Sequence, residues 1–169
     1  LDFVATGNVL RHRLFGAGVR FGAGGTEMAA ELETTAAQVR ARGGRPYVSP
    51  GGGSNPVGAL GYVDCAREIV VGADELDLRV DRIVTATGSA GTHAGLVAGL
   101  AVMGADIPVL GIGVRAPKPR QEENVLKLAR ETAALLGRPE AVTGGMVVAG
   151  CDYVGEGYGL VGDGVIEAL

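Results

Sequence analysis

The sequence predicts an α/β fold in which a mostly parallel sheet carries helices on both faces. Short apolar, β-branched runs alternate along the chain with longer segments of helical periodicity, an order typical of parallel strands joined by helical crossovers. Glycine accounts for 30 of the 169 residues, and many glycines fall where a strand is expected to turn into a helix. The composition, 47% hydrophobic and 20% charged, is that of a globular chain.

Caps, turn residues and periodicity place the individual elements. Helices are expected over 8–15, 27–42, 56–71, 92–103 and 121–136 and from 163 onward, and strands over 19–21, 45–48, 82–87, 108–114 and 152–154. Asn8 and Thr26 are the expected N-terminal caps of the first two helices. Ser54 or Asn55 caps the third, and Pro56 suits its first turn because the missing N–H is not needed there.

Charge and length disfavour several classes of protein. The net charge of −4 and the lack of a Lys/Arg cluster argue against nucleic acid and anionic membranes as partners. No apolar run reaches the roughly 18 residues of a membrane span. Cys65 and Cys151 lack a C-x-x-C partner, and neither His12 nor His93 has a second ligand at metal spacing. The sequence therefore indicates reduced thiols, no metal site and a cytoplasmic location.

Residues 83–100 carry the strongest functional signal. A β-branched strand leads into a glycine- and hydroxyl-rich loop, and a helix of small residues, expected to pack closely on a sheet, follows. The loop residues are Thr87, Gly88, Ser89, Ala90, Gly91 and Thr92. Free backbone N–H groups and the helix dipole favour an anion at a helix N-terminus, so this order predicts a phosphate cradle. We expect the amides of residues 88–92 to converge where a helix begins near Thr92.

The spacing of the glycines argues against two common phosphate sites. A P-loop requires a lysine after its second glycine, and none follows Gly91. The dinucleotide fingerprint requires its first two glycines to be closer than Gly88 and Gly91 are. A cofactor with a single phosphate, held without metal or lysine, remains, and pyridoxal phosphate (PLP) fits that description. The alternatives are a nucleotide-binding oxidoreductase, a non-catalytic fragment or binding module, and an ordinary helix start that binds nothing.

Three stretches together resemble one enzyme family. They are PGGGSNPVGALGYV at 50–63, ATGSAGTHAGL at 86–96 and GYGLVGDG at 157–164. The combination is similar to the family of D-cysteine desulfhydrases and 1-aminocyclopropane-1-carboxylate (ACC) deaminases, which are PLP enzymes with the fold of the tryptophan synthase β-subunit. The resemblance covers nearly the whole chain, and the middle stretch is closer to the desulfhydrase branch.

The resemblance implies a role for the residues that match. The loop residues 87–92 would bind the cofactor phosphate. Tyr158 would act catalytically beside the substrate, while Ser54 and Asn55 would line the substrate pocket. Residues 1–50 would be the remainder of a small domain that covers the cofactor, and residues 51–169 part of the large PLP-binding domain. The implied partners are a small amino-acid substrate and a second copy of the intact protein in a homodimer.

The chain departs from the family at the lysine that bears the cofactor. In the family this lysine lies in a Gly-Asn-Lys segment near the N-terminus, followed by a Ser-Asn loop, and neither segment is present here. Lys118, between prolines, and Lys127, on an amphipathic helix, match neither context. We therefore expect an inactive internal fragment, with the family's second active-site tyrosine beyond Leu169. The intact enzyme would convert D-cysteine to pyruvate, hydrogen sulfide and ammonia, with ACC and L-cysteate as alternative substrates. His93 is expected to be structural.

Overall fold

The computed structural model describes residues 7–23, 27–155 and 162–168, which fall into two compact units, Leu1–Val48 and Ser49–Leu169. The first unit contains helices α1 (Gly7–Leu14) and α2 (Met28–Ala41). The strands expected over 19–21 and 45–48 do not form. Such short segments adopt strand structure only when a neighbouring strand pairs with them, and local propensity does not supply that partner.

Neither predicted cap of the first two helices is confirmed, whereas α2 ends near the predicted position. Asn8 is inside α1, which begins at Gly7, so the prediction that Asn8 caps this helix is wrong. Thr26 lies outside the described residues, and the residue at the cap position of α2, Glu27, makes no side-chain capping bond. Beyond the end of α2, Gly43 has φ +79°, the left-handed conformation that glycine adopts at low cost after a helix.

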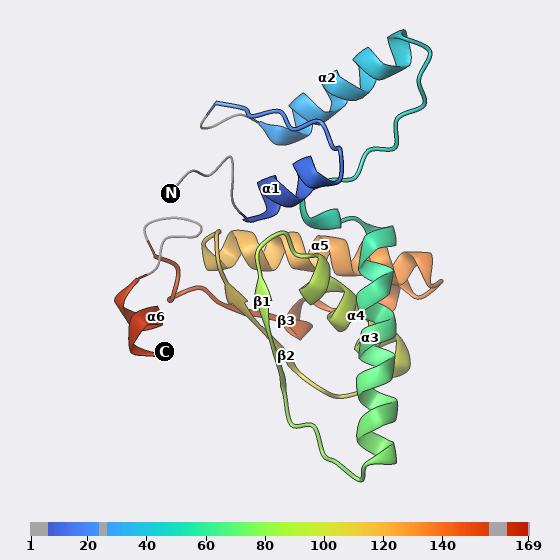
Figure 1. Cartoon of the computed structure of the whole chain (residues 1–169). Coiled ribbons are helices and arrows are strands. Elements are labelled where there is room, and N and C mark those ends of the chain that lie inside the picture. The colour runs from blue at the N-terminus through green and yellow to red at the C-terminus, as the bar shows by residue number, and fades with distance from the viewer. Residues whose placement is uncertain (1–6, 24–26, 156–161, 169) are drawn as a thin grey trace. The chain divides into compact units, whose positions relative to one another are not determined.

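The second unit contains a three-stranded parallel sheet in the order β1-β2-β3 (Figure 1). Its strands are β1 (Ile83–Thr87), β2 (Val109–Gly113) and β3 (Val147–Gly150), joined by the crossover helices α4 (Gly91–Met103) and α5 (Lys118–Leu135). The prediction of a parallel α/β sheet is confirmed. The strand expected over 152–154 is wrong: residues 152 and 153 form a turn, and the third strand lies just before it.

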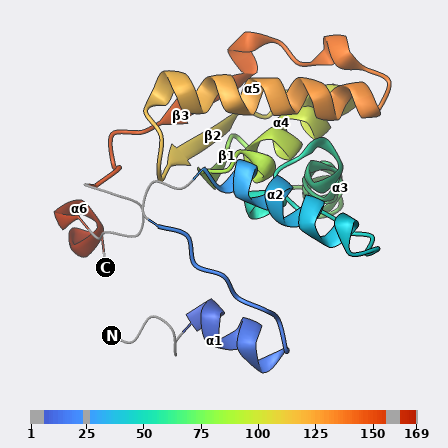
Figure 2. The same ribbon diagram turned by 90° about the horizontal axis from the view of Figure 1, so that it is seen from above.

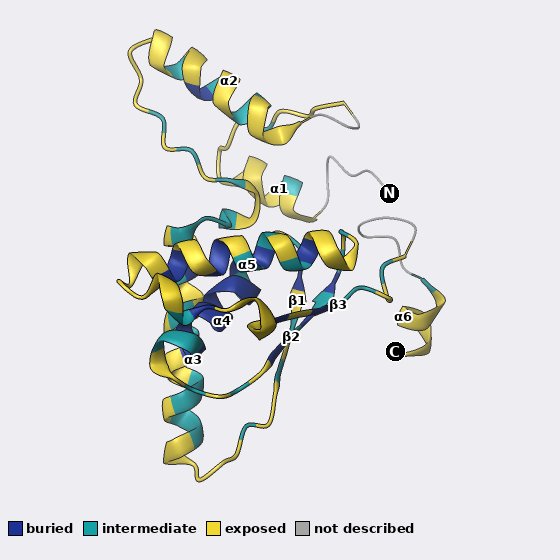
Figure 3. Cartoon of the chain, turned by 180° about the vertical axis from the view of Figure 1, so that it is seen from behind, coloured by how far each residue is buried: buried dark blue, intermediate teal, exposed yellow. Residues whose placement is uncertain are grey.

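Two helices cover one face of this sheet. Helices α4 and α5 pack against the strands (Figure 3). Val109, Val147 and Ala149, on that face of the sheet, are buried. On the opposite face Val84 is 60% and Val148 43% exposed. The described helices that pack on the sheet therefore form one layer, and the second layer expected from the sequence is not seen among the described residues.

Helix α4 is the centre of the unit and lies between α3 (Pro56–Glu75) and α5 (Figure 2). Its glycines serve the contact with α3, whereas the sequence indicated close packing on the sheet. A Cβ atom at Gly95 would collide with the Ala59 carbonyl oxygen, and one at Gly99 would lie 2.8 Å from Ala66 Cβ. The two helix backbones can approach this closely because these positions lack side chains.

The helix N-termini in this unit partly match the predictions. Asn55 Oδ1 accepts a hydrogen bond from the Gly58 amide at 2.7 Å, which confirms Asn55 as the cap of α3, with Pro56 in its first turn. Helix α5 begins at Lys118, earlier than expected, because Pro119 is tolerated in the first turn of a helix. The remaining elements are short: η2 (Gly51–Gly53), η3 (Pro139–Ala141), η4 (Gly144–Met146) and α6 (Asp163–Glu167).

Candidate functional site

The candidate site is the loop that connects β1 to α4, at the carboxyl end of a parallel strand. Strand β1 ends at Thr87, and α4 begins at Gly91, one residue before the predicted start. Ala90 precedes the helix with φ +78°, a conformation that residues other than glycine rarely adopt. The amide groups in the first turn of α4 have no acceptor within the helix. The loop thus places backbone donors at the positive end of a helix dipole.

Ser54 braces this loop from the start of α3. Its hydroxyl donates a hydrogen bond to Ser89 Oγ at 2.8 Å and accepts one from the Gly91 amide at 3.2 Å. A Cβ atom at Gly91 would lie 2.8 Å from Ser54 Oγ, and one at Gly52 would collide with Ser89 Oγ. The fold therefore brings together two of the stretches singled out in the sequence, 50–63 and 86–96, and both glycines are needed for their close approach.

The predicted site residues differ in where their side chains point. Thr87 is 2% exposed, and its hydroxyl accepts a hydrogen bond from Gln121 Nε2 at 2.8 Å, so it faces the interior. Ser89 is exposed at the surface of the loop, and Thr92 is half-buried. Asn55 uses its side-chain oxygen to cap α3. Tyr158, the predicted catalytic residue, lies outside the described residues.

Two hollows flank the loop, and Ser89 contributes to both. The first holds about 560 Å³ and lies at the carboxyl ends of β1 and β2; its lining residues are Ala86, Gly88, Ser89, Val114 and Arg115. The second is lined by Ser54, Ser89, Ala90, Asn124, Lys127, Leu128 and Glu131. Each hollow contains one cationic side chain, Arg115 or Lys127, that could attract an anion. Neither residue is recognisable as a site residue from the sequence, because only the fold brings Arg115, just after β2, and Lys127, on the outer side of α5, beside the loop.

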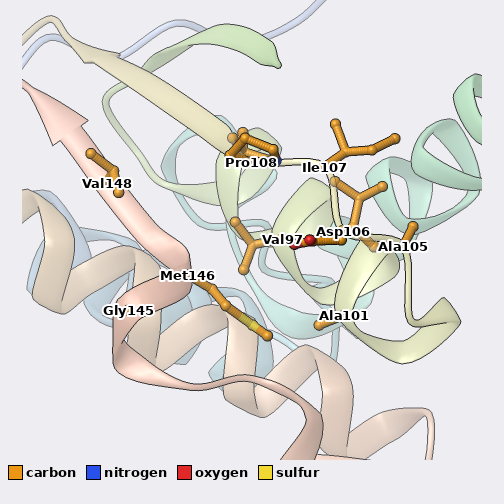
Figure 4. Close-up of a pocket in the computed structure, with 11 residues that line it drawn as sticks. Val97, Ala101, Ala105, Asp106, Ile107, Pro108, Gly145, Met146 and Val148 are labelled. Atoms are coloured by element: carbon orange, nitrogen blue, oxygen red, sulfur yellow. The ribbon is translucent and has the colours of Figure 1, made fainter. Parts of the chain in front are cut away.

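A further cavity lies at the opposite end of the strands (Figure 4). Its walls include Ile107 and Pro108, just before β2, and Met146, just before β3. The side chains that line it are apolar except for Asp106, its one charged residue among those described. A phosphorylated ligand favours cations and hydrogen-bond donors, and none of these lining side chains is a cation or carries a donor group.

The remaining polar groups do not form a second reactive centre in the described part of the chain. Cys65 and Cys151 are free and half-buried, and burial raises the pKa of the Cys151 thiol, which therefore stays protonated at neutral pH. Among the described residues, no group of three or more His, Cys, Asp or Glu could hold a metal ion. None of the helices described is both long and apolar enough to cross a membrane.

A parallel sheet with a glycine- and serine-containing loop before a helix N-terminus defines an α/β protein in which that loop is suited to binding an anion. The chain belongs to the family of pyridoxal-phosphate dependent enzymes, whose model matches residues 2–169. The cofactor of this family is PLP, as predicted, and the family assignment replaces the alternative of a nucleotide-binding oxidoreductase.

Individual relatives support the narrower resemblance. The chain is 35% identical over 168 residues to the D-cysteine desulfhydrase of Salmonella typhi, a match that covers 99% of this chain and 50% of that one. The D-cysteine desulfhydrase of Salmonella paratyphi B is 34% identical over the same length. A solved structure of an ACC deaminase homologue has a TM-score of 0.72 at 35% identity, covering 79% of this chain and 41% of that chain. The chain spans about half the length of the curated relatives it matches.

The residues present fit the phosphate of this cofactor. The cradle is closely packed, since a Cβ atom at Gly91 would lie 2.8 Å from Ser54 Oγ. It offers backbone N–H groups at the start of α4 and the hydroxyl of Ser89, and one cation stands on each side. This donor set suits a phosphate monoester that is held without a metal ion.

Proposed function

We propose that this chain supplies the phosphate-binding part of a PLP-dependent lyase that converts D-cysteine and water to pyruvate, hydrogen sulfide and ammonia. One observation carries the proposal: the β1–α4 loop is braced by Ser54 in a chain that is 35% identical to a D-cysteine desulfhydrase over nearly its whole length. When bound, PLP supplies an electron sink that makes the Cα proton of an amino acid acidic.

Each part of the loop has a proposed task. The backbone amides of Gly88, Ser89, Ala90 and Thr92 hold the cofactor phosphate, since the Gly91 N–H already donates to Ser54, and the hydroxyls of Ser89 and Thr92 add donors on the exposed side. Ser54 keeps Ser89 and the Gly91 amide in place before the cofactor arrives, which lowers the entropy lost on binding. Arg115 and Lys127 add positive charge on either side of the loop.

The same proposal extends to the domains, the substrate-binding residues and the oligomeric state. Residues 51–169 form part of a large cofactor-binding domain, and residues 1–50 the remainder of a small domain that covers the cofactor. Asn55 lies near the substrate, beside the loop that Ser54 braces, and Tyr158 contacts the substrate. The intact protein is a homodimer, and its free cysteines suit a reducing cytoplasm.

We further propose that the lysine that bears the cofactor comes from sequence outside these residues. Lys118 is exposed in the first turn of α5, with its Nζ 3.8 Å from Glu122 Oε1. Lys127 is also exposed, although it lines a hollow beside Ser54 and Ser89. A lysine that bears the cofactor must be held with its amino group at the aldehyde carbon, and neither of these exposed side chains is fixed by burial.

The experiment that tests the substrate is a side-by-side assay of the full-length protein with PLP. D-cysteine, L-cysteine, L-cysteate and ACC are supplied separately, and sulfide, pyruvate and ammonia are measured. We expect sulfide and pyruvate in equal amounts from D-cysteine. Turnover of ACC alone would favour the second candidate, an ACC deaminase, which the structural similarity to an ACC deaminase homologue supports.

A further inference from the structure

Three polar side chains are buried together directly beneath the phosphate-binding loop. Thr87 at the end of β1 is 2% exposed, and His93 in α4 and Gln121 in α5 are fully buried. They come from three different elements of a unit whose hydrophobic core is built from Ala, Val and Leu. Apolar residues of similar size would fill the same space without burying polar atoms, so packing alone does not account for this cluster.

Gln121 connects α5 to the last residue of β1. Its Nε2 donates to Thr87 Oγ1 at 2.8 Å, while the Thr87 carbonyl oxygen accepts from the Val114 amide at 3.1 Å. Thr87 is thus held through its side chain and its backbone, and the next residue, Gly88, begins the loop. The direction in which the loop leaves the sheet therefore depends on a hydrogen bond from the interior side of α5.

His93, in the first turn of α4, packs against Gly111 in β2 beside the Thr87 side chain. A Cβ atom at Gly111 in β2 would lie 2.6 Å from His93 Cε1 and 2.8 Å from Thr87 Cγ2, so the ring and the methyl group share the space above this glycine. Among the described residues, Gln121 Oε1 has no hydrogen-bond partner, and neither His93 ring nitrogen makes a hydrogen bond of good geometry, although the Val109 backbone lies near enough to the ring to raise its pKa. A buried polar group in this state is costly, and such groups are retained where they fix one conformation.

We propose that Gln121 is a positioning residue for the phosphate loop: acting through Thr87, with His93 seated beside it on Gly111, it sets the orientation of the amides that receive the cofactor phosphate. The proposal rests on the proposed function, because it requires that the loop binds the phosphate. It gives Thr87 an indirect role: the side chain supports the loop from below and does not touch the ligand.

Isosteric and conservative variants of the full-length protein test this proposal. Gln121→Leu and Thr87→Val each remove the hydrogen bond and keep the volume, whereas Thr87→Ser keeps the hydroxyl. Thr132→Val is the matched control, because Thr132 is also fully buried in α5 but its hydroxyl donates to the carbonyl oxygen of Leu128 in its own helix. Affinity for PLP, affinity for inorganic phosphate and the midpoint of urea unfolding are measured for each.

We expect Gln121→Leu and Thr87→Val to weaken binding of both probes by about 2-fold to 10-fold, the range that the loss of one hydrogen bond of ordinary strength gives. The double variant should be no weaker than either single variant, because both remove the same bond. Thr87→Ser should restore most of the affinity, and Thr132→Val should bind normally even if its unfolding midpoint falls. In the unliganded protein, the amide resonances of Gly88 and Gly91 should shift in Gln121→Leu and stay in place in Thr132→Val.

Normal phosphate affinity and unshifted amide resonances in Gln121→Leu would overturn the positioning role while leaving the proposed function intact. If Gln121→Leu does not fold, the same comparison is made with Thr87→Val, which changes one atom. An unmodified protein that binds neither PLP nor phosphate would instead remove the proposed function, and this inference with it.

Discussion

Ser54 accepts a hydrogen bond from the amide of Gly91 at 3.2 Å, across 37 positions of the sequence. Gly91 is the first residue of α4, so its N–H is one of the donors that the helix itself leaves unpaired. The same hydroxyl donates to Ser89 Oγ. A single side chain at the start of α3 therefore holds the N-terminal end of α4 in place.

The first prediction follows from this bond. Ser54→Ala should weaken PLP binding by the full-length protein between about 2-fold and 10-fold, because the loop loses a support of about 0.5–1.5 kcal/mol. Fluorescence titration with PLP measures the effect. Ser49→Ala, an exposed serine in the same unit, is the control and should bind normally. Tighter binding by Ser54→Ala would mean that Ser54 competes with the phosphate for the Gly91 amide.

A second prediction concerns the contact between α3 and α4. Gly95→Ala should destabilise the chain by about 1–3 kcal/mol, because its Cβ would collide with the backbone carbonyl of Ala59. Gly61→Ala is the matched control: it also lies within a helix, but a Cβ there meets nothing within 4 Å, so this change should stabilise by about 0.5–1 kcal/mol. Urea unfolding of both variants measures the change in the free energy of unfolding, which should fall in Gly95→Ala and rise in Gly61→Ala. Equal effects would show that α3 and α4 are not in close contact.

The third prediction is a pH dependence of stability. Burial lowers the pKa of His93 from its ordinary 6.5, while the Val109 backbone and the Glu122 carboxylate act in the opposite direction. The unfolded chain therefore binds a proton at His93 more readily than the folded chain does. The stabilising contribution is complete above pH 6.5 and is lost as the pH falls toward the lowered pKa, with a slope of at most about 1.4 kcal/mol per pH unit.

Urea unfolding between pH 7 and pH 5 measures this slope. His93→Leu should remove it, because the variant has no group there to protonate. His12→Gln is the control, since His12 is exposed on α1, and it should keep the slope of the unmodified chain. A slope that persists in His93→Leu would assign the pH dependence to other groups.

The fourth prediction is that this 169-residue chain has no activity by itself. Lys118 and Lys127 are both exposed, and exposed lysines react with PLP weakly and without selectivity. Borohydride reduction in the presence of PLP, followed by peptide mapping, should give no single dominant adduct, and D-cysteine should not be consumed. One specific adduct on Lys127 together with sulfide release would place the active lysine in the hollow beside Ser54.

Local patterns allowed part of this structure to be predicted. The parallel order of strands and helices, the loop between β1 and α4, and the Asn55 cap all follow from residues close together in the sequence. The strand at Val147–Gly150 could not be predicted in this way, because four short apolar residues form a strand only when a neighbouring strand pairs with them. The same dependence on pairing explains why the strands expected over 19–21 and 45–48 are wrong.

The sequence predicts the burial of Gln121 but not its hydrogen-bond partner. Its spacing from Val125, Leu128 and Thr132 places it on the buried side of α5, so the sequence already contained the signal of a buried amide. It did not contain the identity of the partner, Thr87, because that residue reaches the same place through a different crossover of the sheet.

The sequence by itself therefore determined the kind of site: a strand, a loop rich in glycine and hydroxyl groups, and a helix N-terminus that together favour a phosphate. Only the tertiary structure decided which side chains hold that loop, with Ser54 on its outer side and Thr87 and Gln121 beneath it. The physical reason is the range of the forces involved. Backbone propensities and helix caps act within a few residues, whereas these hydrogen bonds join groups that become neighbours only when α4 and α5 pack on the sheet and α3 packs on α4.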